Sequence, residues 1–468
     1  MNAIDCKLPM LEHLRLRNLG ELEEIIDGPI PEGSNSFQTL ESLAVDYLPK
    51  LGYLWKSPNQ NVSLVNLKTI SIEDCSNLRY LFSMATARSL VQLQSLVIHS
   101  CDTIEQVLWN EMESNTEASV IEFPKLKALT LLYLPNLLAF TQGVEIIKSP
   151  LLIELEIGNC PNLRTKIDQF PAGMIEKIVV SGSDNIEEIF RDDGNRHIIF
   201  QELRVLRLEN LSSLTTFYGG VESIKFPKLE ELLIGNLPRL NSFVAIDSEA
   251  THDQNSLHLF CNKKVEIIGL KTLDLWNMPD KINNMWCRHI PISFFQNLET
   301  LIIFKVDGIR NLISSSIAKA LVNLNTLHIY RCKEMIDVIE DETHVTVNSV
   351  FPNLEYLDIE VNCKLRSFCQ WKHAFELPSL VDIQITDCPL MKIFTLGSLS
   401  TPKLHRFQIN GEDIEMKDLN GGIHHFKSTK QNANEDENKD ENNEDEKHED
   451  KKQIKGEENT ESSNNNLM

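Results

Sequence analysis

A small group of metal-binding side chains is the first feature of this sequence that could perform chemistry. His252, His258 and Cys261 lie within one short stretch, and imidazole and thiolate groups are common zinc ligands. Their spacing matches no recognised zinc ligand set, and no fourth ligand lies nearby in the sequence. We therefore interpret the stretch as a surface loop and predict no metal site.

Catalytic and phosphate-binding motifs are also missing. The chain contains neither H-E-x-x-H nor G-x-S-x-G, the motifs of zinc proteases and of many serine hydrolases. The glycine pairs Gly219-Gly220 and Gly421-Gly422 lack the Lys and Ser/Thr of a phosphate-binding loop. The sequence thus predicts a protein that is not an enzyme and that uses no cofactor.

Three aromatic residues offer a different chemistry, the burial of apolar surface against a partner. Trp276, Phe304 and Tyr330 each follow a short pattern in which two apolar residues flank one other residue. The flanked positions in the same three copies hold Asp274, Ile302 and His328. If all six point outward side by side, they form a patch of a kind that soluble proteins seldom display without a partner. Trp and Tyr are also enriched among the residues that dominate binding energy at interfaces.

Two structural interpretations compete with binding at these residues. The three rings could stack on one another, or the insertion at 244–264 could cover them. Replacement of Trp276 and Tyr330 by Ala separates the possibilities. The change should abolish binding and leave thermal stability nearly unchanged if the rings form a binding surface, whereas a collapse in stability would indicate a structural role.

A repeat supplies the elements that position these residues. The pattern L-x-x-L-x-L/I-x-x-C/L/N-x-x-L/I returns about fifteen times between Leu11 and Ile409. Self-similarity of this kind predicts a leucine-rich-repeat solenoid, an α/β repeat fold. Every copy runs in the same direction, so we expect parallel strands on the concave face of a curved horseshoe. Irregular or short helical return segments should join them.

Two recurring positions predict how the coils stack. The position three residues after the last apolar strand residue holds cysteine in five copies: Cys75, Cys101, Cys160, Cys332 and Cys388. Other copies place Leu there, so we predict an apolar pocket filled by buried, reduced thiols. A phenylalanine opens several copies, as Phe200 and Phe226 do, and predicts a second apolar column that runs from coil to coil.

The repeats resemble a known family. The segments FPKLKALTLLYLPNLLAF at 123–140, FPKLEELLIGNLPRLNSF at 226–243 and LVNLKTISIEDCSNLRYLF at 64–82 are similar to the leucine-rich repeats of plant disease-resistance proteins of the coiled-coil nucleotide-binding type. The resemblance covers residues 8–410. It implies a recognition module whose concave face binds a pathogen effector or a guarded host protein, and which restrains a nucleotide-binding switch.

A nucleotide-binding domain is a partner that the resemblance implies and that this chain does not show. No G-x-x-x-x-G-K-[ST] loop precedes the repeats, so nucleotide binding is not transferred. We expect either a repeat-only relative or the downstream part of a longer receptor. The alternative function is a general leucine-rich-repeat scaffold or a ubiquitin-ligase substrate adaptor, although no F-box-like segment is visible.

Composition sets the remaining expectations. A net charge of −23 at pH 7 argues against binding to nucleic acid or anionic membranes. Neither a secretory leader nor an apolar run long enough to span a bilayer is visible, so we expect a cytoplasmic protein. We divide the chain into a solenoid at 1–410, an irregular cap at 411–427 and an acidic tail at 428–468. The tail has too few apolar residues to offset the entropy of ordering, and we expect disorder there.

Overall fold

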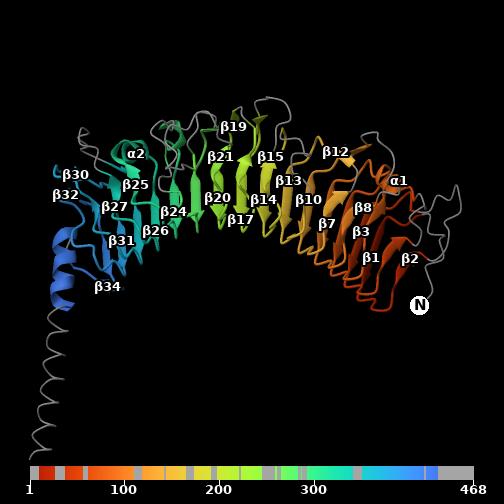
Figure 1. Ribbon diagram of the computed structural model, residues 1–468, viewed down its shortest axis with the longest axis horizontal. Coiled ribbons are helices and arrows are strands. Elements are labelled where there is room, and N and C mark those ends of the chain that lie inside the picture. Colours follow the sequence, from red (N-terminus) through yellow and green to blue (C-terminus); the bar gives the residue numbers. More distant parts are fainter. Residues whose placement is uncertain are drawn as a thin grey trace, which may run out of the picture.

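The structure is a computed structural model in which one long sheet lines the inner side of an arch (Figure 1). Short strands line the outer side, and a helix closes the C-terminal end. The structure describes residues 10–26, 37–55, 62–109, 119–141, 144–164, 173–190, 198–220, 223–244, 259–260, 265–282, 286, 292–340, 350–415 and 418–430.

The inner sheet contains 16 strands, and all neighbours are parallel except for the last strand, which turns back antiparallel. In order these are β1 (His13–Arg17), β3 (Ser42–Asp46), β5 (Thr69–Glu73), β7 (Ser95–His99), β10 (Ala128–Leu132), β13 (Glu154–Gly158), β14 (Lys177–Ser181), β17 (Val205–Glu209), β20 (Glu231–Gly235), β23 (Thr272–Trp276), β24 (Thr300–Phe304), β26 (Thr326–Tyr330), β28 (Tyr356–Glu360), β31 (Asp382–Thr386), β33 (Arg406–Ile409) and β34 (Glu412–Asp413). The predicted leucine-rich-repeat solenoid is confirmed.

The sheet register follows the sequence repeat despite unequal return segments. Leu14 pairs with Leu43 and, across a much longer return segment, Leu232 pairs with Leu273. Within each strand from β3 to β33 the two apolar positions are buried, whereas the residues between and beside them are at least partly exposed in most coils. This alternation has period two because successive side chains of a strand point to opposite faces.

Most return segments carry short parallel strands, which the sequence did not predict. These pair as β2 (Glu24–Ile26) with β4 (Tyr53–Trp55); β6 (Phe82–Ser83), β8 (Gln106–Trp109) and β11 (Ala139–Thr141); β9 (Ser119–Glu122) with β12 (Val144–Lys148); β15 (Glu188–Phe190), β18 (Thr216–Tyr218) and β21 (Ser242–Val244); β16 (Ile198–Ile199), β19 (Ile224–Phe226) and β22 (Val265–Ile267); β25 (Asn311–Ser314), β27 (Asp337–Glu340) and β29 (Ser367–Cys369); and β30 (Phe375–Glu376) with β32 (Leu399–Ser400). Among the described residues, the helical returns are α1 (Met84–Ala87), α2 (Ser315–Ala320) and the 3-10 turn η2 (Ile292–Phe294).

A residue with positive φ follows each concave strand from β1 to β33 and turns the chain away from the sheet. Asn210, Asn236 and Asn277 hold this position in three consecutive coils, with φ of 54°, 53° and 50°. Asparagine tolerates the left-handed region better than most residues. The Asn236 N–H donates to the carbonyl of Trp276 at 2.9 Å, and the side chain of Asn277 donates to that of Asn236. These corners fix where each strand ends.

The cysteine register is buried, as predicted, and all five thiols are free. Each thiol also donates to the carbonyl two residues earlier, for example from Cys332 Sγ to the Tyr330 oxygen at 3.5 Å. In the next coil Asn362 makes the same contact, from Nδ2 to the Glu360 oxygen at 3.0 Å. A carbonyl of the preceding coil also accepts from this side chain in several coils, as that of Ile329 does from Asn362. The site is therefore an apolar pocket with backbone carbonyls in its wall, which explains why cysteine and asparagine both occur there.

Phenylalanines form a column inside the solenoid, which confirms the predicted stacking. The rings of Phe200 and Phe226 lie 5.2 Å apart and nearly parallel. A neighbouring pair, Phe217 and Phe243, is 4.7 Å apart and also stacked. Because aromatic rings of this size contribute large buried areas, the column supports every coil that it crosses.

The C-terminal end of the solenoid is capped by a helix, so the predicted irregular cap at 411–427 is wrong for its second half. The helix covers 419–430. Leu419, Ile423 and Phe426 recur at helical spacing and are buried, and Asp418 accepts hydrogen bonds from two N–H groups of the first turn. The predicted tail lies outside the described residues beyond Lys430. No helix in the described ranges is long and apolar enough to cross a membrane.

Candidate protein-binding surface

The six outward residues singled out in the sequence lie together on the concave face, and we call them the concave patch. They occupy the neighbouring strands β23, β24 and β26 in two rows, Asp274, Ile302 and His328 in one row and Trp276, Phe304 and Tyr330 in the other. Neighbouring strands are about 4.8 Å apart, so each row is continuous. All six side chains are half-buried, which leaves part of each accessible to a partner.

Trp276 rests on the strand next to it. Its indole occupies the space above Gly235 of β20, because a Cβ at Gly235 would lie 1.9 Å from the indole Nε1. Gly235 is the register partner of Trp276. The absence of a side chain at Gly235 is therefore what lets the indole lie flat at the edge of the patch.

Phe304 and Tyr330 each contact a polar neighbour. The guanidinium carbon of Arg331 lies 5.8 Å from the centre of the Phe304 ring, a cation–π distance. The Tyr330 ring stacks on the ring of His328 at 5.5 Å. In the described part of the chain, the rings of Trp276, Phe304 and Tyr330 make no ring contact with one another. Stacking among the three is therefore not what holds them in place.

Tyr330 also belongs to a hydrogen-bonded cluster. Its hydroxyl lies 2.8 Å from Asp358 Oδ2 of β28 and 2.7 Å from His328 Nδ1. The hydroxyl has one proton, which it donates to the carboxylate, so it accepts from the histidine. This assigns a proton to Nδ1 of His328. The cluster joins β26 to β28 and fixes the Tyr330 ring.

The cluster changes the acidity of its members. Burial, followed by the hydrogen bond to Asp358, raises the pKa of the Tyr330 hydroxyl. Burial by itself would also raise the pKa of Asp358, but the neighbouring His328 imidazole, whose Nδ1 lies 3.8 Å from Oδ2, and the hydrogen bond from Tyr330 outweigh burial and lower this pKa. At neutral pH the patch therefore ends in a carboxylate that is already hydrogen-bonded, beside a neutral phenol.

At the β23 end of the patch, the surroundings of Asp274 disfavour the charged form of its carboxyl group. Burial, followed by repulsion from Glu209 and Glu231, raises the pKa of Asp274. No ion pair involves Asp274 among the described residues. A partner that supplies a hydrogen-bond donor or a positive charge here would relieve this repulsion.

Three residues that complete the site were not singled out in the sequence. They are Gly235, Arg331 and Asp358. Alignment of the repeats by strand register would have found two of them, because Gly235 shares the row of Trp276 and Asp358 shares the row of His328. Arg331 follows Tyr330 at a left-handed corner, with φ of 56°. Its contact with Phe304 depends on that turn and leaves no pattern in the sequence.

The insertion at 244–264 is described only in part. Leu259 and Phe260 are buried, and Phe260 packs against Trp286 and Phe294 of the following coil. This anchors part of the insertion inside the solenoid. His252, His258 and Cys261 lie outside the described residues, and in the described ranges no group of three or more metal-binding side chains is placed to hold an ion.

Comparison with solved structures finds other repeat proteins at low identity. A leucine-rich repeat protein from Bacteroides ovatus ATCC 8483 is 9% identical, with 76% of this chain and 75% of that one covered and a TM-score of 0.20. The plant peptide hormone receptor RGFR1, in complex with RGF2, is 16% identical, with 86% and 80% covered and a TM-score of 0.18. Both superpose poorly on this chain.

Sequence comparison gives a clearer result. No curated protein matches the chain. The family model described as plant disease resistance protein RPS2-like, leucine-rich repeats, matches residues 3–102 and 174–333. The second match contains the whole concave patch. Because the two matches together span more than half of the 468 residues, this chain belongs to the family of RPS2-like leucine-rich repeats of plant disease resistance proteins.

Proposed function

We propose that this protein is a recognition module of plant disease resistance that binds a pathogen effector or a guarded host protein through the concave patch. The observation that carries the proposal is the unbroken double row of outward side chains on β23, β24 and β26. It combines three aromatic rings with a carboxyl group and an imidazole. Such mixed apolar and polar surfaces are typical of interface hot spots.

The surroundings of the patch support a binding role. The rings are held by Gly235, Arg331 and the Asp358 cluster, so little side-chain entropy remains to be lost when a partner binds. The patch also lies on the concave side of the arch, where a partner can contact several coils at once (Figure 1).

A nucleotide-binding domain is the second partner that we propose, on the basis of family membership. In such a receptor the repeats would act as the sensor and the nucleotide-binding domain as the switch. This part of the proposal concerns signalling and is independent of which residues contact the effector.

The test measures binding of purified effector proteins secreted by plant pathogens to the immobilised full chain and to its Trp276→Ala/Tyr330→Ala variant. We expect at least one effector to bind the wild-type chain, with affinity reduced at least about 100-fold in the variant, since truncation of one hot-spot residue costs about 2 kcal/mol or more. The variant should lose only about 1–2 kcal/mol of stability, the contribution of the hydrogen bond from Tyr330 to Asp358.

Tyr47→Ala is the matched control, because Tyr47 is an exposed aromatic residue on the distant β3 coil. Its binding should equal that of the wild-type chain. Effector binding that the double variant leaves unchanged would refute the concave patch as the binding surface. A loss of about 3–5 kcal/mol in stability, as for a core aromatic residue, would assign the rings a structural role.

A further inference from the structure

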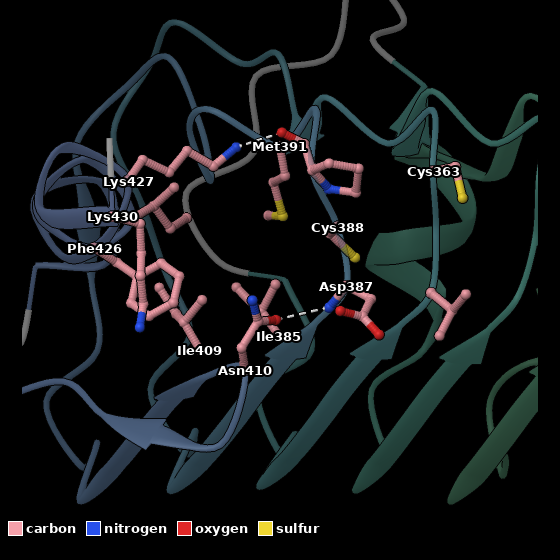
Figure 2. A pocket seen from close by; sticks show the side chains of 13 residues that line it. Cys363, Ile385, Asp387, Cys388, Met391, Ile409, Asn410, Phe426, Lys427 and Lys430 are labelled. Atoms are coloured by element: carbon pink, nitrogen blue, oxygen red, sulfur yellow. Dashed lines mark hydrogen bonds between the residues drawn. The ribbon is translucent and has the colours of Figure 1, made fainter. Parts of the chain in front are cut away.

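A cavity of about 430 Å³ lies between the helix at 419–430 and the last three coils of the solenoid (Figure 2). Its volume falls within the range of pockets that hold small molecules. Figure 2 shows Phe426, Lys427 and Lys430 on the helix side, facing Ile385 and Cys388 of the solenoid. The cavity is remote in sequence from the concave patch and shares no residue with it.

The wall of the cavity is largely apolar. Its main apolar side chains, from both the coils and the helix, are Ile385, Met391, Ile409, Ile423 and Phe426. All five are nearly inaccessible from outside the protein. An apolar cavity of this size leaves the last coil with fewer packing contacts than the coils in the middle of the solenoid.

One wall residue is apolar at a conformational cost. Val361 lines the cavity at the left-handed corner after β28, with φ of 54°. The next two coils place Asp387 and Asn410 at the equivalent corner, and these residue types accept positive φ much more readily than a β-branched residue does. The chain therefore keeps an apolar side chain in the cavity wall where a polar one would be less strained.

A cation at the edge of the cavity has no anionic partner in the described part of the chain. Lys427 Nζ donates to the carbonyl oxygen of Pro389 at 2.7 Å. Burial, followed by repulsion from Lys392, lowers the pKa of Lys427. Lys430 differs, because its ammonium pairs with Glu412 at 2.7 Å. In Figure 2 the carboxyl group of Asp387 lies on the side of the cavity away from the Lys427 ammonium.

We propose that this cavity binds a small carboxylic acid with an apolar body. The carboxylate would pair with Lys427, and the apolar body would lie against Ile409, Ile423 and Phe426. A carboxylate can form a charge-assisted hydrogen bond with the Lys427 ammonium, which is stronger than a hydrogen bond from this ammonium to a neutral molecule. The apolar body restores the contacts that the cavity lacks. The proposal stands independently of effector binding at the concave patch.

The test is calorimetric titration of the full chain with decanoate and with decan-1-ol, which share an apolar body and differ in charge. Decanoate should bind at one site, at least about tenfold more tightly than the alcohol. Lys427→Gln retains a donor for the Pro389 carbonyl but removes the charge, and should weaken decanoate binding about tenfold while leaving the alcohol unaffected. Lys364→Gln, at an exposed lysine paired with Glu334, is the control and should bind as the wild type does.

A second variant tests the position of the apolar body. Ile409→Phe fills the cavity and should abolish binding of both probes, and circular dichroism checks that the fold is retained. The proposal fails if decanoate shows no saturable binding to the wild-type chain. It also fails if acid and alcohol bind equally well, or if folded Ile409→Phe binds decanoate normally.

Discussion

Asp358 controls how the concave patch responds to pH. Burial would raise its pKa, but the nearby His328 imidazole and the hydrogen bond from Tyr330 outweigh burial, so the pKa is lower in the folded protein than in the unfolded chain. A group with a depressed pKa stabilises the fold above its unfolded value, which is about 3.9 for aspartate, and this contribution disappears as the pH falls through the folded value. Tyr330 has the opposite shift, so its contribution is complete below about pH 10 and is lost as the pH rises further.

We predict that Asp358→Asn lowers the free energy of unfolding by about 1–2 kcal/mol at pH 7, the range of a partly exposed charged hydrogen bond. Below about pH 4 the difference from the wild type should shrink, since the Asp358 carboxylate of the unfolded chain then takes up a proton while that of the folded protein is still ionised. Urea unfolding between pH 3 and pH 7 measures this. Asp102→Asn, at an exposed residue away from the cluster, serves as control, and a pH-independent difference for Asp358→Asn would contradict the assignment.

At the residue scale, the sequence predicted which side chains point outward but not what holds them. Period-two alternation is enough to place Trp276, Phe304 and Tyr330 on one face. The contacts of Tyr330 with Asp358 and of Trp276 with Gly235 join consecutive coils, across whole return segments of the chain. They depend on rotamers and on the width of each turn, and neither is encoded in a local pattern.

At the scale of elements, the packing of the Trp276 indole of β23 over β20 depends on the missing side chain of Gly235. Gly235→Ala would place a Cβ in the indole of Trp276, so the ring must move out of its position. We predict a loss of about 1–3 kcal/mol in the free energy of unfolding, as for other overpacked sites, together with weaker effector binding. Denaturant unfolding of the variant measures the loss of stability, and tryptophan fluorescence reports the displacement of the indole.

The matched control is Gly158→Ala, at the same register position on β13. Its Cβ would meet the ends of the Leu132 and Ser181 side chains, which can rotate away. We expect a change below about 1 kcal/mol. Equal effects of the two substitutions would mean that the indole is not held by Gly235.

Elements were predictable to unequal degrees. The concave strands repeat a strong apolar pattern, and their register survived even the longest return segment. Many of the outer strands, such as β15 and β30, contain only two or three residues, too few to show alternation. The helix at 419–430 did carry a signal, because Leu419, Ile423 and Phe426 recur at helical spacing, but this pattern covers only two turns and borders an acidic segment.

At the scale of the whole molecule, stability is shared between neighbouring coils. Leu206 of β17 is fully buried between two coils, whereas Leu14 of β1, at the same register position, is half-buried. In a solenoid each coil contacts only its neighbours, so the loss on truncation depends on position along the arch. We predict that Leu206→Ala lowers the free energy of unfolding by about 3 kcal/mol and Leu14→Ala by about 1 kcal/mol.

Chemical denaturation of the two variants, followed by far-ultraviolet circular dichroism, gives the comparison. Leu43→Ala provides a further reference, since Leu43 is buried in the second coil and should resemble Leu206. If Leu14→Ala were as damaging as Leu206→Ala, the first coil would be as well packed in solution as the central ones.

The separation between the buried and outward positions of each strand also has an evolutionary consequence. Backbone hydrogen bonds and inward leucines hold the coils together, so most outward side chains can be exchanged without loss of the fold. New outward surfaces can therefore arise one residue at a time, and few of these substitutions would unfold the protein. Trp276 is an exception, because any side chain at position 235 would displace its indole. A larger residue at position 235 therefore requires a smaller one at position 276.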